Sequence, residues 1–496
     1  MNKRTLIMRL DWPDLRINFK TLFAIILIPV LAGCSTNPAT GEQQFAALMS
    51  PQQEVNVGAK EHENVVKQFG LYDNPALNAY VNQIGQKVSQ YTERSDVQYK
   101  FFIVDSPITN AFALPGGYVY VSRGLLSLAN SEAELAAVLG HEVGHITGRH
   151  SAERYSTGVV TSLGAAVIAA AIGGESASQA LGVGSDLLLK SYSRDQENEA
   201  DTLGIRYLAR SGYDTRAMTS FLGNLQADSA LEAKIDGRDA PGASYFSTHP
   251  ATSDRVAKTV VQAGNYQGEG QTNRDGYLAM LNGMPYGDSA AQGFARGQDF
   301  YHTAMGFAFT VPQGFKITNQ PDSVAAVSKT GAVMLFDMVS HDLSSDPAAY
   351  IGQVWMKDQP INGVEKTMIN DMKAASAGFQ GRVNGRPMNI RLVAIEWQPG
   401  TVARFQIAIP DGAPVALVED IIRATRSFRV LSPSERHSIQ PYKLRIVTAG
   451  VGDSVFSLAG TMPFDDFREE RFRVLNGMRP DETVQAGRQY KVVSTR

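Results

Sequence analysis

The sequence predicts a multidomain protein, with a mainly α-helical N-terminal domain that holds a small β-sheet, then an α+β domain and a small βααβ unit. Its 496 residues are too many for one ordinary core. Charged residues make up 19% and hydrophobic residues 43%, the composition of folded globular protein. Helical patterns dominate the first half and strand patterns the second. The predicted segments are a signal peptide (1–33), the helical domain (34–264), a polar glycine-rich linker (265–294), the α+β domain (295–430) and the βααβ unit (438–496).

Charge and cysteine content narrow the class of protein. The formal net charge of −3 offers no basic surface to a polyanion, which argues against nucleic acid as a partner. Cys34 is the single cysteine of the chain, so an internal disulfide is excluded.

The first residues have the layout of a secretory signal peptide. Basic residues precede a short apolar run, TLFAIILIPVLAGC, which is too short for a stable membrane span. Its last four residues resemble a bacterial lipobox, which implies cleavage after Gly33 and lipidation of Cys34. Ser35, next in line, favours anchoring at the outer membrane. The alternative is a buried cysteine in a short apolar helix.

Serine caps mark the helix starts of the N-terminal domain. Ser50 precedes a proline in the first turn, and Ser131 and Ser193 each have Glu or Gln three residues on, as in a capping box. The stretches YKFFIVDS and NAFALPGGYVYVSRG predict strands, the second with a Gly-Gly turn. The apolar residues 157–174 predict a packed or mobile helical hairpin, with membrane contact as the alternative.

The stretch HEVGHITGRHS carries a His-Glu-x-x-His motif on the helix that Ser131 starts. His141 and His145 are four residues apart, so both imidazoles lie on one helix face and can bind one metal ion. Glu142 lies one step further round, within reach of a metal-bound water, where a general base belongs. A third ligand is still needed, and the position at which metzincins have a histidine is Ser151 here.

Spacing offers two candidates for the third ligand. His150 is nine residues from His141, on the opposite helix face unless the helix breaks, so we expect a surface or second-layer histidine there. The stretch SRDQENEADTLG places Glu197 and Asp201 on one face of another helix, whereas Glu199 points away. Glu197 would complete a two-histidine, one-glutamate site of the gluzincin type, with a solvated charge as the alternative. Asp201 would accept a proton from a ligand histidine and orient its ring.

These stretches together resemble the HtpX-like and CAAX-prenyl-protease-like zinc metallopeptidases. The resemblance covers roughly residues 40–260 and rests on NAFALPGGYVYVSRGLL, SEAELAAVLGHEVGHITGRH, SRDQENEADTLG and STHPATSDR, in that order. It implies a gluzincin-type fold, one Zn²⁺ per chain on His141, His145 and Glu197, and Glu142 as the catalytic base. The multi-pass membrane spans of the prenyl proteases are not seen in this sequence, so the resemblance is to a periplasmic branch.

The same resemblance places His249, in STHP, near the metal. It would serve either as a hydrogen-bond donor to the transition state or as a reversible fourth ligand that blocks the site; a structural loop histidine is the alternative. Glu142 would take a proton from a water whose pKa zinc lowers, before that water attacks a peptide carbonyl. The substrate would add as a β-strand, unless the strand is ordinary sheet core, along Asn110, Ala111, Phe112 and Ala113.

The two rear segments resemble binding domains. YHTAMGFAFTVPQGFKI is similar to the start of PsbP-like domains. The stretches YKLRIVTAGVGDSVFSLAGTM, FRVLNGM and VQAGRQYKVV are similar to a LysM repeat, despite an insertion around PFDDFREER. LysM modules bind glycans that contain N-acetylglucosamine, so peptidoglycan is the implied partner, with a structural cap as the alternative.

Three functions are compatible with these features. The first is a zinc endopeptidase, anchored in the periplasm as an outer-membrane lipoprotein, that cleaves misfolded or unassembled envelope proteins. The second is a lipid-anchored, peptidoglycan-tethered chaperone or scaffold, and the third is a zinc cell-wall hydrolase. An intact Glu142 argues against the scaffold and a strand-type substrate edge against the wall hydrolase, so the endopeptidase is our prediction.

Overall fold

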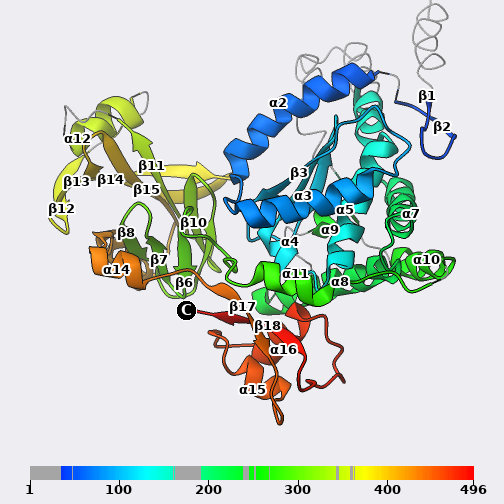
Figure 1. Ribbon diagram of the computed structural model, residues 1–496. Coiled ribbons are helices and arrows are strands. Elements are labelled where there is room, and N and C mark those ends of the chain that lie inside the picture. The colour runs from blue at the N-terminus through cyan, green and yellow to red at the C-terminus, as the bar shows by residue number, and fades with distance from the viewer. Residues whose placement is uncertain are drawn as a thin grey trace, which may run out of the picture.

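The computed structural model of the chain (Figure 1) describes residues 35–46, 48–159, 161, 191–237, 245–250, 253–266, 268–341, 346–357, 361 and 363–495. The predicted signal peptide, Cys34 and most of the apolar stretch 157–174 lie outside the described residues. Within the described part of the chain, no helix is both long and apolar enough to cross a membrane.

The N-terminal domain consists of helices around a three-stranded sheet, as the sequence predicts. Its elements are β1 (Ser35–Thr36), β2 (Gln43–Gln44), α2 (Pro51–Phe69), α3 (Pro75–Ser89), β3 (Lys100–Val104), β4 (Ala111–Leu114), β5 (Tyr118–Ser122), α4 (Arg123–Leu128), α5 (Glu132–Thr147), α7 (Arg194–Arg210), α8 (Arg216–Asp236), α9 (Tyr245–Thr248) and α10 (Ser253–Gly264). The strand order is β3-β5-β4, with β3 parallel and β4 antiparallel to β5. Among the described strands, β4 is therefore an edge strand. Every residue of α5 is buried, so this helix is the centre of the domain.

The serine caps lie where the sequence predicts them, with one difference. Ser50 and Ser193 form reciprocal capping boxes with glutamines three residues on. Ser131 accepts a hydrogen bond from the backbone N–H of Glu134, but the Glu134 carboxylate does not return it. That carboxylate instead accepts from the backbone N–H of Asn130 at 2.7 Å, because polar side chains of α8 also hold it. The predicted capping box at Ser131 is therefore only half formed.

The middle of the chain folds into two antiparallel sheets, which agrees with the predicted α+β domain. The order of the larger sheet is β12-β13-β14-β15-β11-β10-β9, and that of the smaller is β16-β8-β7-β6. Phenylalanine side chains from both sheets, with Phe428 next to β16, fill the space between them. The elements are β6 (Phe294–Arg296), β7 (Asp299–His302), β8 (Phe307–Thr310), β9 (Phe315–Asn319), β10 (Ser323–Ser328), β11 (Val333–Ser340), α12 (Pro347–Tyr350), the π-helical turn η3 (Ile351–Trp355), β12 (Glu365–Ile369), β13 (Met372–Val383), β14 (Arg386–Gln398), β15 (Thr401–Pro410), α13 (Val415–Arg426), β16 (Arg429–Val430) and α14 (Pro433–Ser438).

The predicted linker, residues 265–294, contains a helix, α11 (Arg274–Leu281). Tyr277, Leu278 and Leu281 are fully buried in the core of the N-terminal domain. The sequence did not reveal this helix because its few apolar residues stand among glycines and polar residues.

The C-terminal unit has the predicted βααβ order, with β17 (Lys443–Thr448), α15 (Val455–Ala459), α16 (Arg468–Leu475) and β18 (Gln489–Ser494). Its apolar side chains, including Leu444 and Phe472, belong to the same buried cluster as those of the N-terminal domain. This unit lies directly below α8 and α11 (Figure 1). The unit therefore shares the hydrophobic core of the N-terminal domain and is not an independently packed domain.

Lys491 of β18 connects this unit to α4. Its side chain is fully buried, and Nζ donates to the carbonyl oxygens of Ser127, Leu128 and Ala129, at 2.5, 3.2 and 2.7 Å. These carbonyls end α4, and carbonyls at a helix end need donors from outside the helix. The C-terminal unit thus caps the helix that comes just before α5.

Replacement of Lys491 by methionine is expected to destabilise the protein, because buried carbonyls lose their donor. The expected cost is about 2 to 3 kcal/mol in the free energy of unfolding, measured by urea denaturation. Lys443→Met, on the paired strand β17, is the control and is expected to have a much smaller effect. Equal stability of the two variants would contradict the capping role.

Candidate metal centre

The two helices that carry the predicted ligands, α5 and α7, cross at very close range. A Cβ atom on Gly144 would lie 3.0 Å from the carbonyl oxygen of Ala200, and one on Gly140 would lie 3.3 Å from that of Gly204. Larger residues there would push the backbones apart. Small residues at these crossings therefore bring the His-Glu-x-x-His face of α5 against the start of α7.

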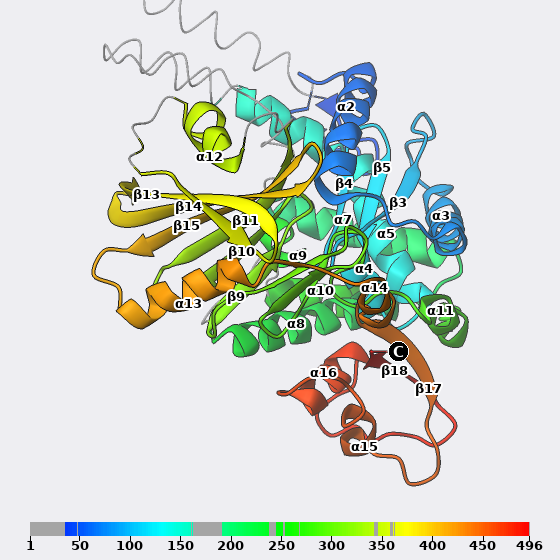
Figure 2. The same ribbon diagram turned by 90° about the vertical axis from the view of Figure 1, so that its left-hand side faces the viewer.

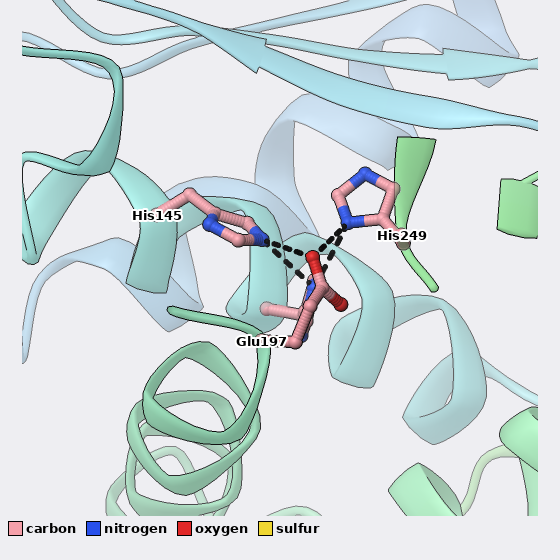
Figure 3. A group of neighbouring side chains, drawn as sticks. His145, Glu197 and His249 are labelled. Atoms are coloured by element: carbon pink, nitrogen blue, oxygen red, sulfur yellow. Dashed lines mark hydrogen bonds and ion pairs between the residues drawn. The ribbon is translucent and has the colours of Figure 1, made fainter. Parts of the chain in front are cut away.

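The structure brings together His141, His145, Glu197 and His249, whose candidate ligand atoms all lie within 4.8 Å of one another. Nε2 of His145 lies 3.0 Å from Nε2 of His141 and 3.4 Å from Oε1 of Glu197. Nδ1 of His249 lies 2.9 Å from the same Glu197 oxygen and 3.3 Å from Nε2 of His141. In Figure 3, His145 and His249 point at Glu197 from two sides. All four side chains are buried.

This set of side chains fits a zinc ion. Zn–N and Zn–O distances near 2.0 to 2.1 Å put the ligand atoms of a tetrahedral site roughly 3.4 Å apart. Here several pairs of these atoms lie 2.9 to 3.5 Å apart, and all lie within 4.8 Å of one another. Two imidazole nitrogens 3.0 Å apart also need a cation or proton between them. Three imidazoles and one carboxylate are ligands that Zn²⁺ prefers.

A second layer of side chains holds the two histidines of α5. Asp201 Oδ1 lies 2.9 Å from Nδ1 of His141, so that an N–H at Nδ1 leaves Nε2 facing the cluster. His150 lies behind His145, with the two Nδ1 atoms 2.8 Å apart, and its Nε2 is 3.6 Å from Glu199. Arg149 has a positive φ, so the helix breaks there and His150 turns inward. His150 is thus a buried second-layer residue, and Glu199 points away from the cluster, as predicted.

Glu142 lies beside the cluster with both of its carboxylate oxygens buried. Neither oxygen has a hydrogen-bond partner among the described residues, although Oε1 lies 3.5 Å from Nε2 of His249. Burial raises the pKa of Glu142. A buried carboxylate that is held next to a ligand set, with free lone pairs, is suited to accept a proton there.

Arg255 is a charged residue of this site that the sequence did not reveal. Its guanidinium donates to both oxygens of Asp201, at 2.6 and 2.9 Å, and Nη1 lies 2.5 Å from Oε2 of Glu197. Burial raises the pKa of Asp201, but Arg255 outweighs burial and lowers it. Arg255 is the last residue of the stretch STHPATSDR. As a buried cation, it is the counterion of two buried carboxylates, Glu197 and Asp201.

Two tyrosines cover the cluster. Tyr192 stacks on His145 with ring centroids 3.6 Å apart, and Tyr245 stacks on His249 at 4.3 Å. The backbone N–H of Tyr245 donates to the carbonyl oxygen of Thr109, just before β4. Both aromatic residues lie outside the motif stretches, so spacing could not reveal them.

The pKa values of His141 and His145 are shifted in opposite directions. Burial lowers the pKa of His141, but hydrogen bonds to Asp201 and Glu197 outweigh burial and raise it to about 9. Burial keeps the pKa of His145 well below its usual range. The protein without metal therefore holds a proton on His141 at neutral pH, in the place where a cation fits.

A His-Glu-x-x-His helix beside a glutamate of a second helix is an arrangement typical of zinc metallopeptidases. Residues 75–260 match the family model described as Peptidase family M48. The match supports the predicted zinc metallopeptidase class, whereas the HtpX-like branch stays a prediction.

The similar proteins are named as proteases, and one of those below as a metalloendopeptidase. The putative beta-barrel assembly-enhancing protease of Vibrio cholerae is 34% identical over 205 residues, which are 40% of this chain and 41% of that protein. The beta-barrel assembly-enhancing protease of Escherichia coli is 29% identical over 42% of this chain and 44% of its own length. The mitochondrial metalloendopeptidase OMA1 of Schizosaccharomyces pombe is 28% identical over 40% of this chain and 57% of its own length. The chain thus spans about half the length of these relatives, and the findings support a metalloendopeptidase.

One similar solved structure is cyanobacterial PsbP from Synechocystis. It is 12% identical, covers 27% of this chain and 91% of its own, and has a TM-score of 0.23. That score carries no argument, so the PsbP-like interpretation stays a prediction.

Zinc binding to the metal-free protein is expected to release about one proton near pH 7, because the proton on His141 must leave. Affinity should therefore fall as the pH falls below about 9, by up to about tenfold per pH unit. Calorimetric titration in two buffers of different ionisation enthalpy counts the protons. An affinity that does not change with pH would contradict this assignment.

Asp201→Asn is expected to weaken zinc binding by about 10- to 100-fold, since His141 loses the acceptor that orients its ring. Competition with a zinc chelator measures the affinity. Asp195→Asn, an exposed carboxylate on the same helix, is the matched control, and equal affinities for both variants would rule out the orienting role.

Proposed function

We propose that the chain is a zinc-dependent endopeptidase that acts on polypeptide substrates. The observation that carries the proposal is the buried group of His141, His145 and Glu197 with Glu142 beside it, on two helices that cross at close range. Zinc, bound there, would lower the pKa of a water and polarise the scissile carbonyl. Glu142 would take the proton from that water and hand it to the leaving amine.

His249 fits the role of a reversible fourth ligand. Its Nδ1 lies among the other ligand atoms, and its ring is held by the stacked Tyr245. In this position His249 would fill the fourth coordination position, which water or substrate needs in a catalytic zinc site. Activity would then require the segment Tyr245–Thr248 to move aside, after which His249 would be available as a hydrogen-bond donor to the substrate.

Edge strand β4 supports the proposed mode of substrate binding. Its outer side has no strand partner among the described residues, and it runs beside α5. A substrate added along Asn110, Ala111, Phe112 and Ala113 would be held through its backbone, so many sequences would bind. Unfolded segments are therefore the proposed substrates.

The proposed setting is the bacterial cell envelope. Two of the relatives are named for enhancing beta-barrel assembly, which supports misfolded or unassembled envelope proteins as substrates. Lipidation of Cys34 would anchor the chain to the outer membrane in the periplasm.

Peptidoglycan is the proposed partner of the C-terminal unit. In support, the unit has the βααβ order of a LysM repeat and a groove of about 1000 Å³ beside α15 and α16. Phe456, which lines this groove, is 74% exposed, and an exposed aromatic ring suits a sugar face.

The test is cleavage of unfolded casein by zinc-loaded protein and by Glu142→Gln. We expect this variant to lose about 10²- to 10⁴-fold in kcat/KM while it still binds zinc. Glu63→Gln, an exposed glutamate of α2, is the control. Unchanged turnover of casein by Glu142→Gln would overturn the mechanism. If no form of the protein cleaved casein, a scaffold would be favoured. Release of muropeptides from purified sacculi would favour a wall hydrolase.

A further inference from the structure

A groove separates α8 from the edge strand β9 of the seven-stranded sheet. It consists of two adjoining cavities of about 790 and 350 Å³, which share Ile108 and Glu232 in their linings. Figure 2 shows β9 beside α8. The larger cavity is lined by the outer strand β9 and by six carboxylates against two lysines, namely Asp105, Asp228, Glu232, Asp236, Asp288 and Asp322 against Lys67 and Lys316.

Three of these carboxylates form a stripe along α8. Asp228, Glu232 and Asp236 are four residues apart, and like charges at that spacing destabilise a helix. Asp236 pairs with Lys316 of β9 across the groove. Asp228 accepts a hydrogen bond from Thr109, and Glu232 is exposed; among the described residues neither has a cationic partner within ion-pair distance. Arg471 lines the smaller cavity with them, but its ion pair is with Asp466, at 3.3 Å. The stripe therefore keeps two carboxylates that a further cation can reach.

The ion pair between Lys316 and Asp236 shows which backbone conformation of a partner fits the stripe. Lys316 is a lysine on an extended strand, and it meets one end of the stripe. Carboxylates four residues apart on a helix are about 6 Å apart, and alternate residues of a β-strand are about 6.7 Å apart. An extended chain with basic residues at alternate positions can therefore meet Glu232 and Asp228 in turn.

The groove leads to the proposed substrate strand. Its lining includes Ile108, which is 44% exposed, and Thr109. Thr109 lies two residues before the start of β4. The carbonyl of Thr109 accepts from Tyr245, which stacks on His249. A chain that occupies the groove would thus continue along β4 into the cluster.

We propose that this groove, the α8–β9 groove, binds an extended polypeptide segment that carries Lys or Arg at alternate positions, and that it selects substrates with such a segment beside the cleaved bond. Among the described strands β9 pairs only with β10, so its outer side can accept a further strand, and α8 offers the charges. The selection of substrates rests on the proposed endopeptidase function, whereas the binding itself does not.

Binding is tested with the zinc-loaded full chain that carries Glu142→Gln, by fluorescence anisotropy of three labelled peptides. One has lysines at alternate positions, one has the same lysines as adjacent pairs, and one has glutamines in their place. The alternating peptide is expected to bind about fivefold or more tightly than the glutamine peptide and more tightly than the paired one. The difference should shrink at high salt.

Glu232→Gln is expected to remove at least half of that preference, and Glu232→Lys to reverse it. Glu419→Gln, an exposed glutamate of α13 outside the groove, is the matched control and should keep the preference. Equal binding of the alternating and glutamine peptides, or an undiminished preference in Glu232→Gln, would overturn the proposal. Casein cleavage with no lysine preference in binding would refute the groove alone, and lysine-selective binding with no cleavage would refute the endopeptidase alone.

Discussion

The close crossing of α5 and α7 is the constraint on which the rest of the site depends. Gly140 and Gly144 of α5 lie against Gly204 and Ala200 of α7, with almost no space for added side-chain atoms. His141 and His145 stand next to these glycines in sequence, so the crossing fixes their distance from Glu197. A wider crossing would leave two histidines and a carboxylate too far apart for one ion.

Burial then fixes the electrostatics of the crossing. Fully buried carboxylates need compensating charge, and Arg255 supplies it to both Glu197 and Asp201. The remaining need for positive charge falls on the centre of the cluster, where His141 takes a proton in the absence of metal. A divalent cation bound at this position would supply the same compensation. Metal binding at this cluster would then be coupled to the stability of the helix pair.

The sequence predicted the parts of the site that lie on regular helices. Spacing placed His141 and His145 on one helix face, and Glu197 and Asp201 on another, and the structure brings these four together. It could not supply Arg255 or Tyr245, because those residues reach the cluster through tertiary packing rather than through helical spacing from the motif. The helix α11 and the half-formed cap at Ser131 were missed for the same reason, since contacts from elsewhere in the fold override the local pattern.

The C-terminal unit was predicted as a separate domain, yet its buried side chains join the core that surrounds α5. Phe472 and Lys491 reach α4 and the start of α5 through this shared core. A load on the exposed face of the unit, around Phe456, would therefore be transmitted to the helix that carries the His-Glu-x-x-His motif. Since packed interiors resist deformation, attachment of this unit to a large scaffold would hold α5 and its neighbours in place rather than let the two parts move independently.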